Sequence, residues 1–514
     1  MPEPEPRSDG DLLHEWLRQS AVARPDAVAL IEEERETTFT ELFAQAQSLA
    51  LRFCECGIEP RDRIVLALPK STDAIVALFA ALLAGATYVP IHPRWPRERL
   101  VAVLAECGAR LLIDGDGARP RILDLLTGAT IAWPAQAARG ADLARVPQVP
   151  PLGPGRLPIM RSEDTALILF TSGSTGQPKG VELTHRAVSA FVRWTAREFQ
   201  IVAGDRIACP SPLGFDLSTF DIFNMALRGA TAVLAPDNIV WMPRFLVRFL
   251  RESRVSCWYS VPSILAGMLR EGGMAAHSYP DLRLILFAGE VFPAPALAKL
   301  LAAAPDALCA NLYGPTETNV VTWCPVPPCF DGSQPLPIGH PCPYAKVRID
   351  ENSGELLAGG DSLMRGYWNR PDETECRMVT LDGVTYYRTG DRVSRAPDGN
   401  YLFAGRLDRQ IKRRGFRIEL GEIEAALLGQ EDILESAVVA VEDGQKGIVI
   451  AAFIRLSSPG AVTLADLKAF CGRRLPPYML PDRFHFLDAI TKGNRGKIDY
   501  LALGKIAEGL NCGD

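Results

Sequence analysis

The sequence lacks the features that mark nucleic-acid-binding, membrane-spanning and secreted proteins. Its 55 Lys and Arg are outnumbered by 61 Asp and Glu, which gives a net charge of −6 without any long basic run. Because phosphate backbones require clustered Lys and Arg, nucleic acid is not an expected partner. The longest apolar stretch, residues 74–84, is too short to cross a bilayer and predicts a buried helix. Residues 1–6 are acidic and proline-rich, unlike a signal peptide. We therefore expect a cytoplasmic protein with no membrane partner.

The twelve cysteines do not have the spacing of a metal site. Cys54 and Cys56 are close together, and Cys324, Cys329 and Cys342 are loosely grouped. A zinc site usually has two tight pairs. The sequence therefore favours free, buried thiols in a reducing compartment over a metal centre.

The order of apolar runs predicts an α/β fold, organised as an α+β multidomain protein. The 514 residues leave room for two or more domains. Amphipathic helical patterns alternate with short apolar runs up to the region of Gly339, and short strands with Gly and Asp turns follow. Predicted strands lie at residues 63–68, 110–113, 165–170, 231–234, 256–261 and 282–287. We expect a disordered lead at 1–10, a large N-terminal core domain of α/β sheets plus a β-rich subdomain at 11–407, and a small, mobile C-terminal α+β domain at 408–514.

The loop at residues 171–180 (TSGSTGQPKG) directly follows the apolar strand and predicts a polyphosphate ligand. Glycines allow successive backbone N–H groups to face an anion, and the hydroxyls and Lys179 add donors and positive charge. The spacing is not that of a Walker A loop. A flexible linker is the alternative, but linkers rarely follow a buried strand directly.

This loop resembles the phosphate-binding signature of the adenylate-forming superfamily, which includes acyl-CoA synthetases, luciferases and the adenylation domains of nonribosomal peptide synthetases. The resemblance extends over residues 12–503, with further motifs in family order. These motifs are AGATYVP at 84–90, NLYGPTE at 311–317, GELLAGG at 354–360, YRTGD at 387–391 and the stretch 405–419. The resemblance implies ATP and Mg²⁺ as cofactors.

The resemblance also assigns roles to single residues. Tyr313 would meet the adenine ring, Thr316 the α-phosphate, Glu317 the Mg²⁺, and Asp391 the ribose hydroxyls. The implied ATP- and AMP-binding residues are Thr171, Ser172, Gly173, Ser174, Thr175, Gly176, Lys179, Gly289, Glu290, Asn311, Leu312, Tyr313, Gly314, Thr316, Asp391 and Arg406. Alone, the Tyr-Gly-Pro-Thr sequence would favour a surface turn, and an Asp after Gly is more often a turn residue.

Two further residues belong to the implied machinery of the small domain. Asp408 would be the hinge about which this domain rotates between two half-reactions. Lys497 would bridge the substrate carboxylate and the α-phosphate, where positive charge lowers the barrier. The catalytic residues implied are Lys497, Thr316 and Glu317. The sequence departs from the family motif at Arg495, where Asn usually precedes Gly-Lys.

Asp216, in the segment GFDLSTF at 214–220, favours an amino acid as the activated acid. In adenylation domains an Asp at this position pairs with the substrate α-ammonium, and acyl-CoA synthetases generally lack it. A buried carboxylate needs a cationic partner. The alternative is a helix N-cap ahead of Ser218.

The positions that line the family's substrate pocket are apolar here, apart from Asp216, Lys497 and the phenol of Tyr259. The implied substrate-binding residues are Phe215, Asp216, Leu217, Phe220, Tyr259, Leu286, Ala288, Leu312, Val320 and Val321. Charged side chains would be unpaired in such a pocket. The set is similar to that of stand-alone L-proline adenylating enzymes, which implies L-proline and a peptidyl carrier protein with phosphopantetheine as partner in trans. Alanine, valine, an acyl- or aryl-CoA ligase and a non-catalytic scaffold are the alternatives.

Overall fold

The structure is a computed structural model that describes residues 11–114, 131–134 (backbone only), 157–173, 177–443, 447–458, 460–492 and 498–509. The predicted lead at 1–10, Ser174, Thr175, Gly176 and Lys497 lie outside these residues. The chain forms two compact units. The first comprises Met1–Pro93, Glu106–Phe170 and Gly180–Leu407, and the second comprises Arg94–Ala105, Thr171–Lys179 and Asp408–Asp514.

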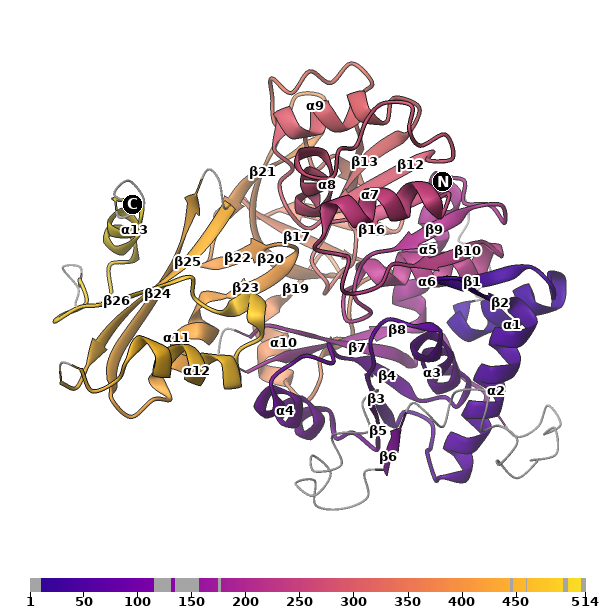
Figure 1. Cartoon of the computed structure of the whole chain (residues 1–514), viewed down its shortest axis with the longest axis horizontal. Helices are drawn as coiled ribbons and strands as arrows, with labels where there is room; N and C mark the ends of the chain where they lie inside the picture. Colours follow the sequence, from indigo (N-terminus) through magenta and orange to yellow (C-terminus); the bar gives the residue numbers. More distant parts are fainter. Residues whose placement is uncertain are drawn as a thin grey trace. The chain divides into compact units, whose positions relative to one another are not determined.

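The largest sheet of the first unit has nine strands (Figure 1). Its strands, in spatial order, are β15 (His340–Pro341), β14 (Thr322–Pro325), β13 (Leu308–Tyr313), β12 (Leu284–Ala288), β11 (Cys257–Ser260), β9 (Arg206–Cys209), β10 (Thr231–Leu234), β1 (Val28–Glu32) and β2 (Arg35–Thr38). The strands from β13 to β1 run parallel, and the edge strands pair antiparallel.

A second sheet of seven strands is mostly parallel as well. Its order is β18 (Gly366–Tyr367), β8 (Lys179–Thr184), β7 (Thr165–Thr171), β4 (Thr87–Pro90), β3 (Arg63–Ala67), β5 (Leu111–Asp114) and β6 (Ile131–Pro134). The β-rich part that follows is a separate antiparallel sheet of β16 (Ala345–Ile349), β17 (Glu355–Gly360), β20 (Val384–Arg395), β19 (Met378–Leu381) and β21 (Tyr401–Arg406).

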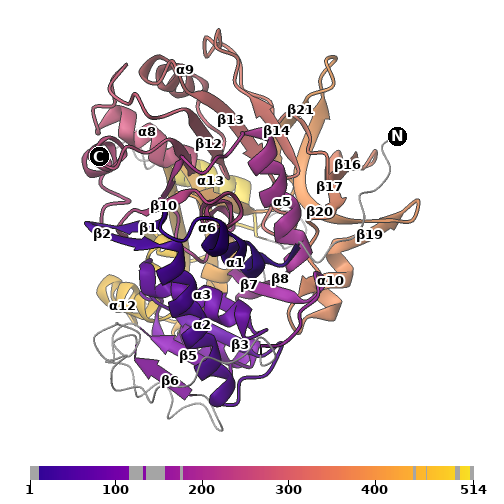
Figure 2. The same ribbon diagram turned by 90° about the vertical axis from the view of Figure 1, so that its right-hand side faces the viewer.

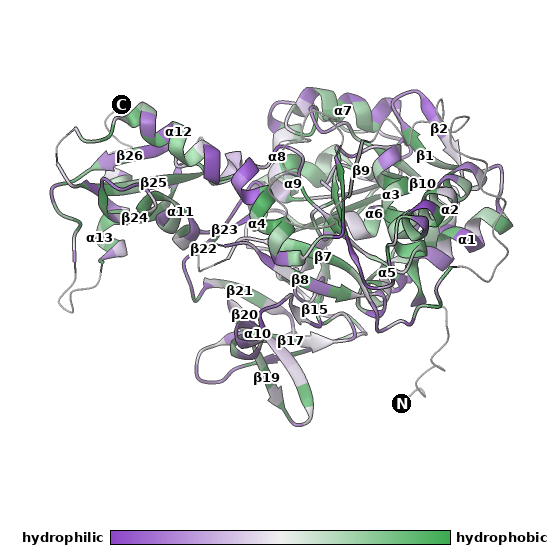
Figure 3. Ribbon diagram, turned by 90° about the horizontal axis from the view of Figure 1, so that it is seen from below, coloured by the Kyte–Doolittle hydropathy of each residue, from purple (hydrophilic) through white to green (hydrophobic). Residues whose placement is uncertain are grey.

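Helices cover both large sheets, because parallel strands must be buried on two faces. They are α1 (Leu13–Ala23), α2 (Phe39–Glu55), α3 (Thr72–Leu83), α5 (His185–Glu198), α6 (Leu217–Arg228), α7 (Pro243–Glu252), α8 (Pro262–Arg270), α9 (Ala294–Ala303) and α10 (Pro371–Arg377). Helix α4 (Arg97–Cys107) falls largely within the segment Arg94–Ala105 of the second unit. The predicted buried helix is α3, which contacts β1 of one sheet and β3 and β4 of the other. It packs against α2 (Figure 2), and all of its residues except Asp73 are buried. The outer helix α7 is amphipathic and carries both colours in Figure 3.

The C-terminal part of the second unit is a small α/β layer structure. Its elements are β22 (Gln410–Arg413), β23 (Phe416–Glu419), α11 (Leu420–Leu428), β24 (Ile433–Asp443), β25 (Gly447–Leu456), α12 (Leu464–Arg474), a 3-10 turn at Pro477–Met479, β26 (Arg483–Phe486) and α13 (Tyr500–Gly509). Alternate residues of β24 and β25 point to opposite faces. Val438 and Ile450 pack with α11 and α12, whereas Val439 and Ala451 pack with α13.

The predicted α/β and α+β fold class is confirmed by these sheets and their helices. Each predicted strand corresponds to an observed one, with ends that differ by one or two residues. In the described part of the chain, no helix is both long enough and apolar enough to cross a membrane.

Candidate active site

The apolar residues predicted to line the substrate pocket meet at the carboxyl ends of β11, β12 and β13. Tyr259 lies opposite Leu286, and Ala288 lies opposite Leu312, in the parallel register of these strands. All four side chains are buried. The order of the parallel strands therefore brings together residues that are far apart in the sequence. In open parallel sheets, ligands bind at this edge.

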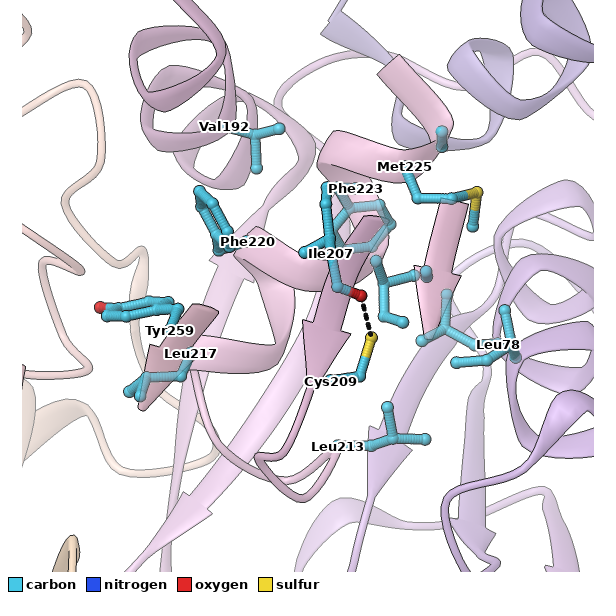
Figure 4. Packing of buried hydrophobic residues seen from close by; sticks show 14 of the residues in the cluster. Leu78, Val192, Ile207, Cys209, Leu213, Leu217, Phe220, Phe223, Met225 and Tyr259 are labelled. Carbon is cyan, nitrogen blue, oxygen red and sulfur yellow. Dashed lines mark hydrogen bonds between the residues drawn. The ribbon is translucent and has the colours of Figure 1, made fainter. Parts of the chain in front are cut away.

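Helix α6 places Asp216, Leu217 and Phe220 against the same strands. The ring of Phe220 packs edge-to-face on Tyr259, with 5.4 Å between ring centroids. Figure 4 shows Leu217 beside Tyr259, whose phenol oxygen points away from the aliphatic cluster around Leu78. Burial raises the pKa of the Tyr259 phenol, and the negative charge of Asp216 raises it further. The Asp216 carboxylate therefore acts electrostatically on this phenol.

Asp216 occupies the N-cap position of α6 without capping it. Its backbone is helical (φ −59°, ψ −28°), and its side chain accepts no cap hydrogen bond. The hydroxyls of Ser218 and Thr219 instead bond backwards to the carbonyls of Phe215 and Asp216, at 2.7 and 2.6 Å. The alternative that Asp216 serves as an N-cap is therefore not supported by this geometry.

Val320 and Val321, the last two residues predicted to line the substrate pocket, lie after the turn that follows β13. A Cβ on Gly314 would be 1.7 Å from the Asn319 carbonyl oxygen, so only glycine allows the chain to return this closely. Val320 and Val321 follow and are buried. The Tyr344 hydroxyl donates to the Val320 carbonyl oxygen at 2.5 Å. Tyr344 was not predicted from the sequence, since no motif includes it.

Tyr313 and Asp391, both expected at the nucleotide, are hydrogen-bonded to each other. The Tyr313 hydroxyl donates to one carboxylate oxygen at 2.5 Å, and Arg406 donates to the other at 2.8 Å. Burial, followed by the charge of Asp391, raises the pKa of the Tyr313 phenol. The half-buried Asn311 donates to the Pro337 carbonyl at 2.9 Å. The YRTGD and NLYGPTE motifs thus meet through their side chains.

Glu317, the expected metal ligand, is buried and held by two phenols. Tyr367 and Tyr387 donate to its Oε1 atom at 2.7 and 2.9 Å. A carboxylate fixed in this way is a suitable hard ligand for Mg²⁺, which takes one or two carboxylates plus phosphate oxygens and water. In the part of the chain described, no group of three or more His, Cys, Asp or Glu residues could hold a metal ion.

The remaining predicted residues of the first unit lie around the same strand ends. Gly289 has φ +93° directly after β12, and Glu290 accepts the Ser263 backbone N–H at the start of α8, at 3.0 Å. Thr316 is half-buried in the turn before Glu317. Tyr387 belongs to a motif found in the sequence, but its contact with Glu317 was not predicted. Tyr367 carried no sequence signal at all.

In the second unit, the described part of the phosphate loop contacts the C-terminal segment. The Ser172 hydroxyl donates to the Arg417 carbonyl at 2.7 Å, and the Gly173 N–H donates to Glu422 at 3.2 Å. A Cβ on Gly173 would be 1.9 Å from the Gln177 carbonyl oxygen. Asp408, the predicted hinge, accepts the Gln410 N–H at 3.2 Å.

Comparisons with known proteins identify relatives over nearly the whole chain. The model of the family "AMP-binding enzyme" matches residues 17–368, and that of "AMP-binding enzyme C-terminal domain" matches 422–497. An L-proline--[L-prolyl-carrier protein] ligase from Pseudomonas fluorescens is 36% identical over 97% of this chain and 100% of its own length. A ligase of the same name from Streptomyces coelicolor is 34% identical over 91% of each chain.

Solved structures agree with this assignment. The crystal structure of IdnL1 matches with a TM-score of 0.76 and 31% identity, over 94% of this chain and 99% of its own. The ordered motifs and the ligase class predicted from them are thereby confirmed: the chain belongs to the AMP-binding enzyme family.

Proposed function

We propose that this protein uses ATP to convert an amino acid, with L-proline favoured, into aminoacyl-AMP and then transfers it to the phosphopantetheine thiol of a separate peptidyl carrier protein. The observation that carries the proposal is the position of Asp216. It precedes Leu217 and Phe220 of α6, and its negative charge acts on the phenol of Tyr259, which packs against Phe220 beside the buried ends of β12 and β13. A carboxylate in such a setting pairs with an α-ammonium group, and apolar walls accept a small aliphatic or cyclic side chain. The names of the two proline ligases among the relatives support the same substrate.

In the first step, a substrate carboxylate oxygen attacks the α-phosphorus of ATP. An O–P bond forms, the bond from the α-phosphorus to the bridging oxygen breaks, and pyrophosphate leaves. Lys497 would stabilise the charge that gathers on the α-phosphate. Glu317 would hold Mg²⁺ with Tyr367 and Tyr387 fixing its orientation, and the ion would neutralise phosphate charge.

In the second step, the carrier thiol loses its proton to solvent and attacks the acyl carbon. A C–S bond forms, the C–O bond to phosphate breaks, and AMP leaves. We propose that Asp408 is the hinge between these two steps and that residues 11–407 and 408–514 act as separate domains. The cysteines of the described residues are free thiols, which supports a cytoplasmic location.

ATP–pyrophosphate exchange with each amino acid in turn tests this proposal. Proline should give the fastest exchange, ahead of alanine and valine, and free coenzyme A should not serve as acceptor. Exchange with no amino acid, together with thioester formation on coenzyme A from another acid, would instead indicate an acyl-CoA ligase.

A further inference from the structure

Lys70 is a buried lysine, next to the loop that carries Asp216, that the proposed mechanism does not use. It lies between β3 and α3, and its side chain is only 1% exposed. Burying an ammonium group costs several kcal/mol unless it is well paired. An apolar side chain of similar size would avoid this cost. The presence of a lysine here therefore indicates that its charged group makes contacts that an apolar side chain could not make.

The Lys70 ammonium is bonded to the first two residues of the loop between β9 and α6. Its Nζ atom donates to the Pro210 carbonyl at 3.0 Å and to the Ser211 carbonyl at 3.4 Å. Asp237, which follows β10, lies 3.7 Å from the same Nζ and also accepts the Lys70 backbone N–H. Lys70 thus ties together the carboxyl ends of three strands.

The same loop, residues 210–216, ends at Asp216 and has little freedom along its length. The Ser218 hydroxyl bonds to the Leu213 and Phe215 carbonyls at 3.2 and 2.7 Å. A Cβ on Gly214 would be 3.3 Å from the Pro90 carbonyl oxygen, so the loop packs closely on the end of β4. Helix α6 therefore fixes one end of the loop, and Lys70 fixes the other.

The charges around Lys70 favour this arrangement. Burial lowers the pKa of the Lys70 ammonium, and the negative charge of Asp237 opposes this shift. Asp221, on α6, is fully buried, and neither of its carboxylate oxygens has a hydrogen-bond partner within the described residues. Burial raises its pKa well above the usual range, which leaves Asp237 as the charged partner of Lys70.

We propose that Lys70 is a positioning residue for substrate recognition: by holding the Pro210 and Ser211 carbonyls, it places Asp216 where the α-ammonium of the substrate binds. This inference rests on the proposed role of Asp216. Lys70 is buried and contacts the loop through these two backbone carbonyls, so in this role it acts on the substrate through Asp216.

Lys70→Met tests the inference, since it keeps the length of the side chain and removes its donors. Losing hydrogen bonds from a charged group should raise the KM for proline in ATP–pyrophosphate exchange roughly 10- to 100-fold. The KM for ATP should change less than about twofold, because Tyr313, Asp391 and Arg406, proposed for the nucleotide, are held by hydrogen bonds to one another. Lys70→Arg, which keeps charge and donors, should recover most of the affinity. If Lys70→Met does not fold, Lys70→Gln, with one amide donor group, should give an intermediate increase.

Arg283→Met is the matched control. Arg283 also pairs with an aspartate, Asp205, and also bonds to two carbonyls, those of Phe199 and Gln200 at 3.1 and 3.0 Å. It precedes β12, at the opposite end of that strand from Ala288. A rise in the proline KM equal to that of Lys70→Met, or a parallel rise in both KM values, would reduce Lys70 to a structural role.

Asp216→Ala separates the inference from the proposed function. An unchanged proline KM in Asp216→Ala would overturn the proposed role of Asp216 and the inference with it. A raised KM in Asp216→Ala with a normal KM in Lys70→Met would overturn the inference alone. In the double variant, Lys70→Met should add little to Asp216→Ala, because residues that act as one unit are not additive.

Discussion

Replacing Asp216 by alanine should damage amino acid recognition without destabilising helix α6. The side chain stands at the N-cap position but makes no cap hydrogen bond, so its removal should not cost the ~1 kcal/mol typical of a lost cap. Its negative charge raises the pKa of the Tyr259 phenol, and in the proposed function this carboxylate pairs with the substrate α-ammonium.

The expected loss of activity in Asp216→Ala can be estimated from how deeply the Asp216 carboxylate is buried. Removing one partner of a hydrogen-bonded charge pair costs about 2–5 kcal/mol when the pair is buried. Asp216 is only half-buried, so we expect about 2–4 kcal/mol, which is roughly a 30- to 1000-fold loss in kcat/KM for proline.

The assay is ATP–pyrophosphate exchange over a range of proline concentrations, combined with thermal unfolding. Thr184→Ala is a suitable control, because the Thr184 hydroxyl does cap α5 by accepting the Ala187 N–H at 3.1 Å. It should lower the unfolding temperature and leave the KM for proline unchanged. The reasoning is refuted if Asp216→Ala lowers the unfolding temperature as much as Thr184→Ala does while proline exchange stays near normal.

Three further predictions concern the proposed catalytic lysine, the proposed metal ligand and the response to acid. Lys497→Ala should lower the exchange rate roughly 100-fold or more with an unchanged circular dichroism spectrum, and near-normal exchange would exclude its role. Tyr387→Phe removes one donor to Glu317 and should raise the Mg²⁺ concentration for half-maximal exchange roughly 10-fold; an unchanged Mg²⁺ titration would contradict this. Burial lowers the pKa of His14 to about 4 and that of His185 to about 3, below the unfolded value of about 6.5. The two neutral imidazoles therefore contribute fully to the free energy of unfolding above pH 6.5. This contribution is lost as the pH falls toward 4, by about 3 kcal/mol for His14. By calorimetry, the unfolding temperature should fall less between pH 7 and pH 5 in His14→Leu than in the unaltered protein. Equal decreases in the two proteins would show that His14 does not cause the acid sensitivity.

Much of the fold could be predicted because its strands are short apolar runs between helical patterns. Tyr259, Leu286 and Leu312 were placed in one pocket from motif positions alone, and the parallel register of β11, β12 and β13 brings them together. Their proximity follows from the strand order, and their role as pocket residues stays a prediction.

Contacts between distant segments could not be predicted in this way. Tyr367 and Glu317 are 50 positions apart in the sequence, and their hydrogen bond depends on how β18 pairs with β8. Lys70 follows a strand and precedes a helix, a place where a lysine is usually solvated. Only the packing of three strand ends makes it buried.

The central claim is that this protein adenylates an amino acid selected by Asp216 and an apolar pocket. The most direct test is to incubate the protein with Mg·ATP and an equimolar mixture of the twenty amino acids, and to identify the adenylates formed by mass spectrometry. Our account predicts that prolyl-AMP is the main product and that it disappears in Asp216→Ala. The absence of any aminoacyl-AMP, or a charged amino acid as the main product, would contradict it.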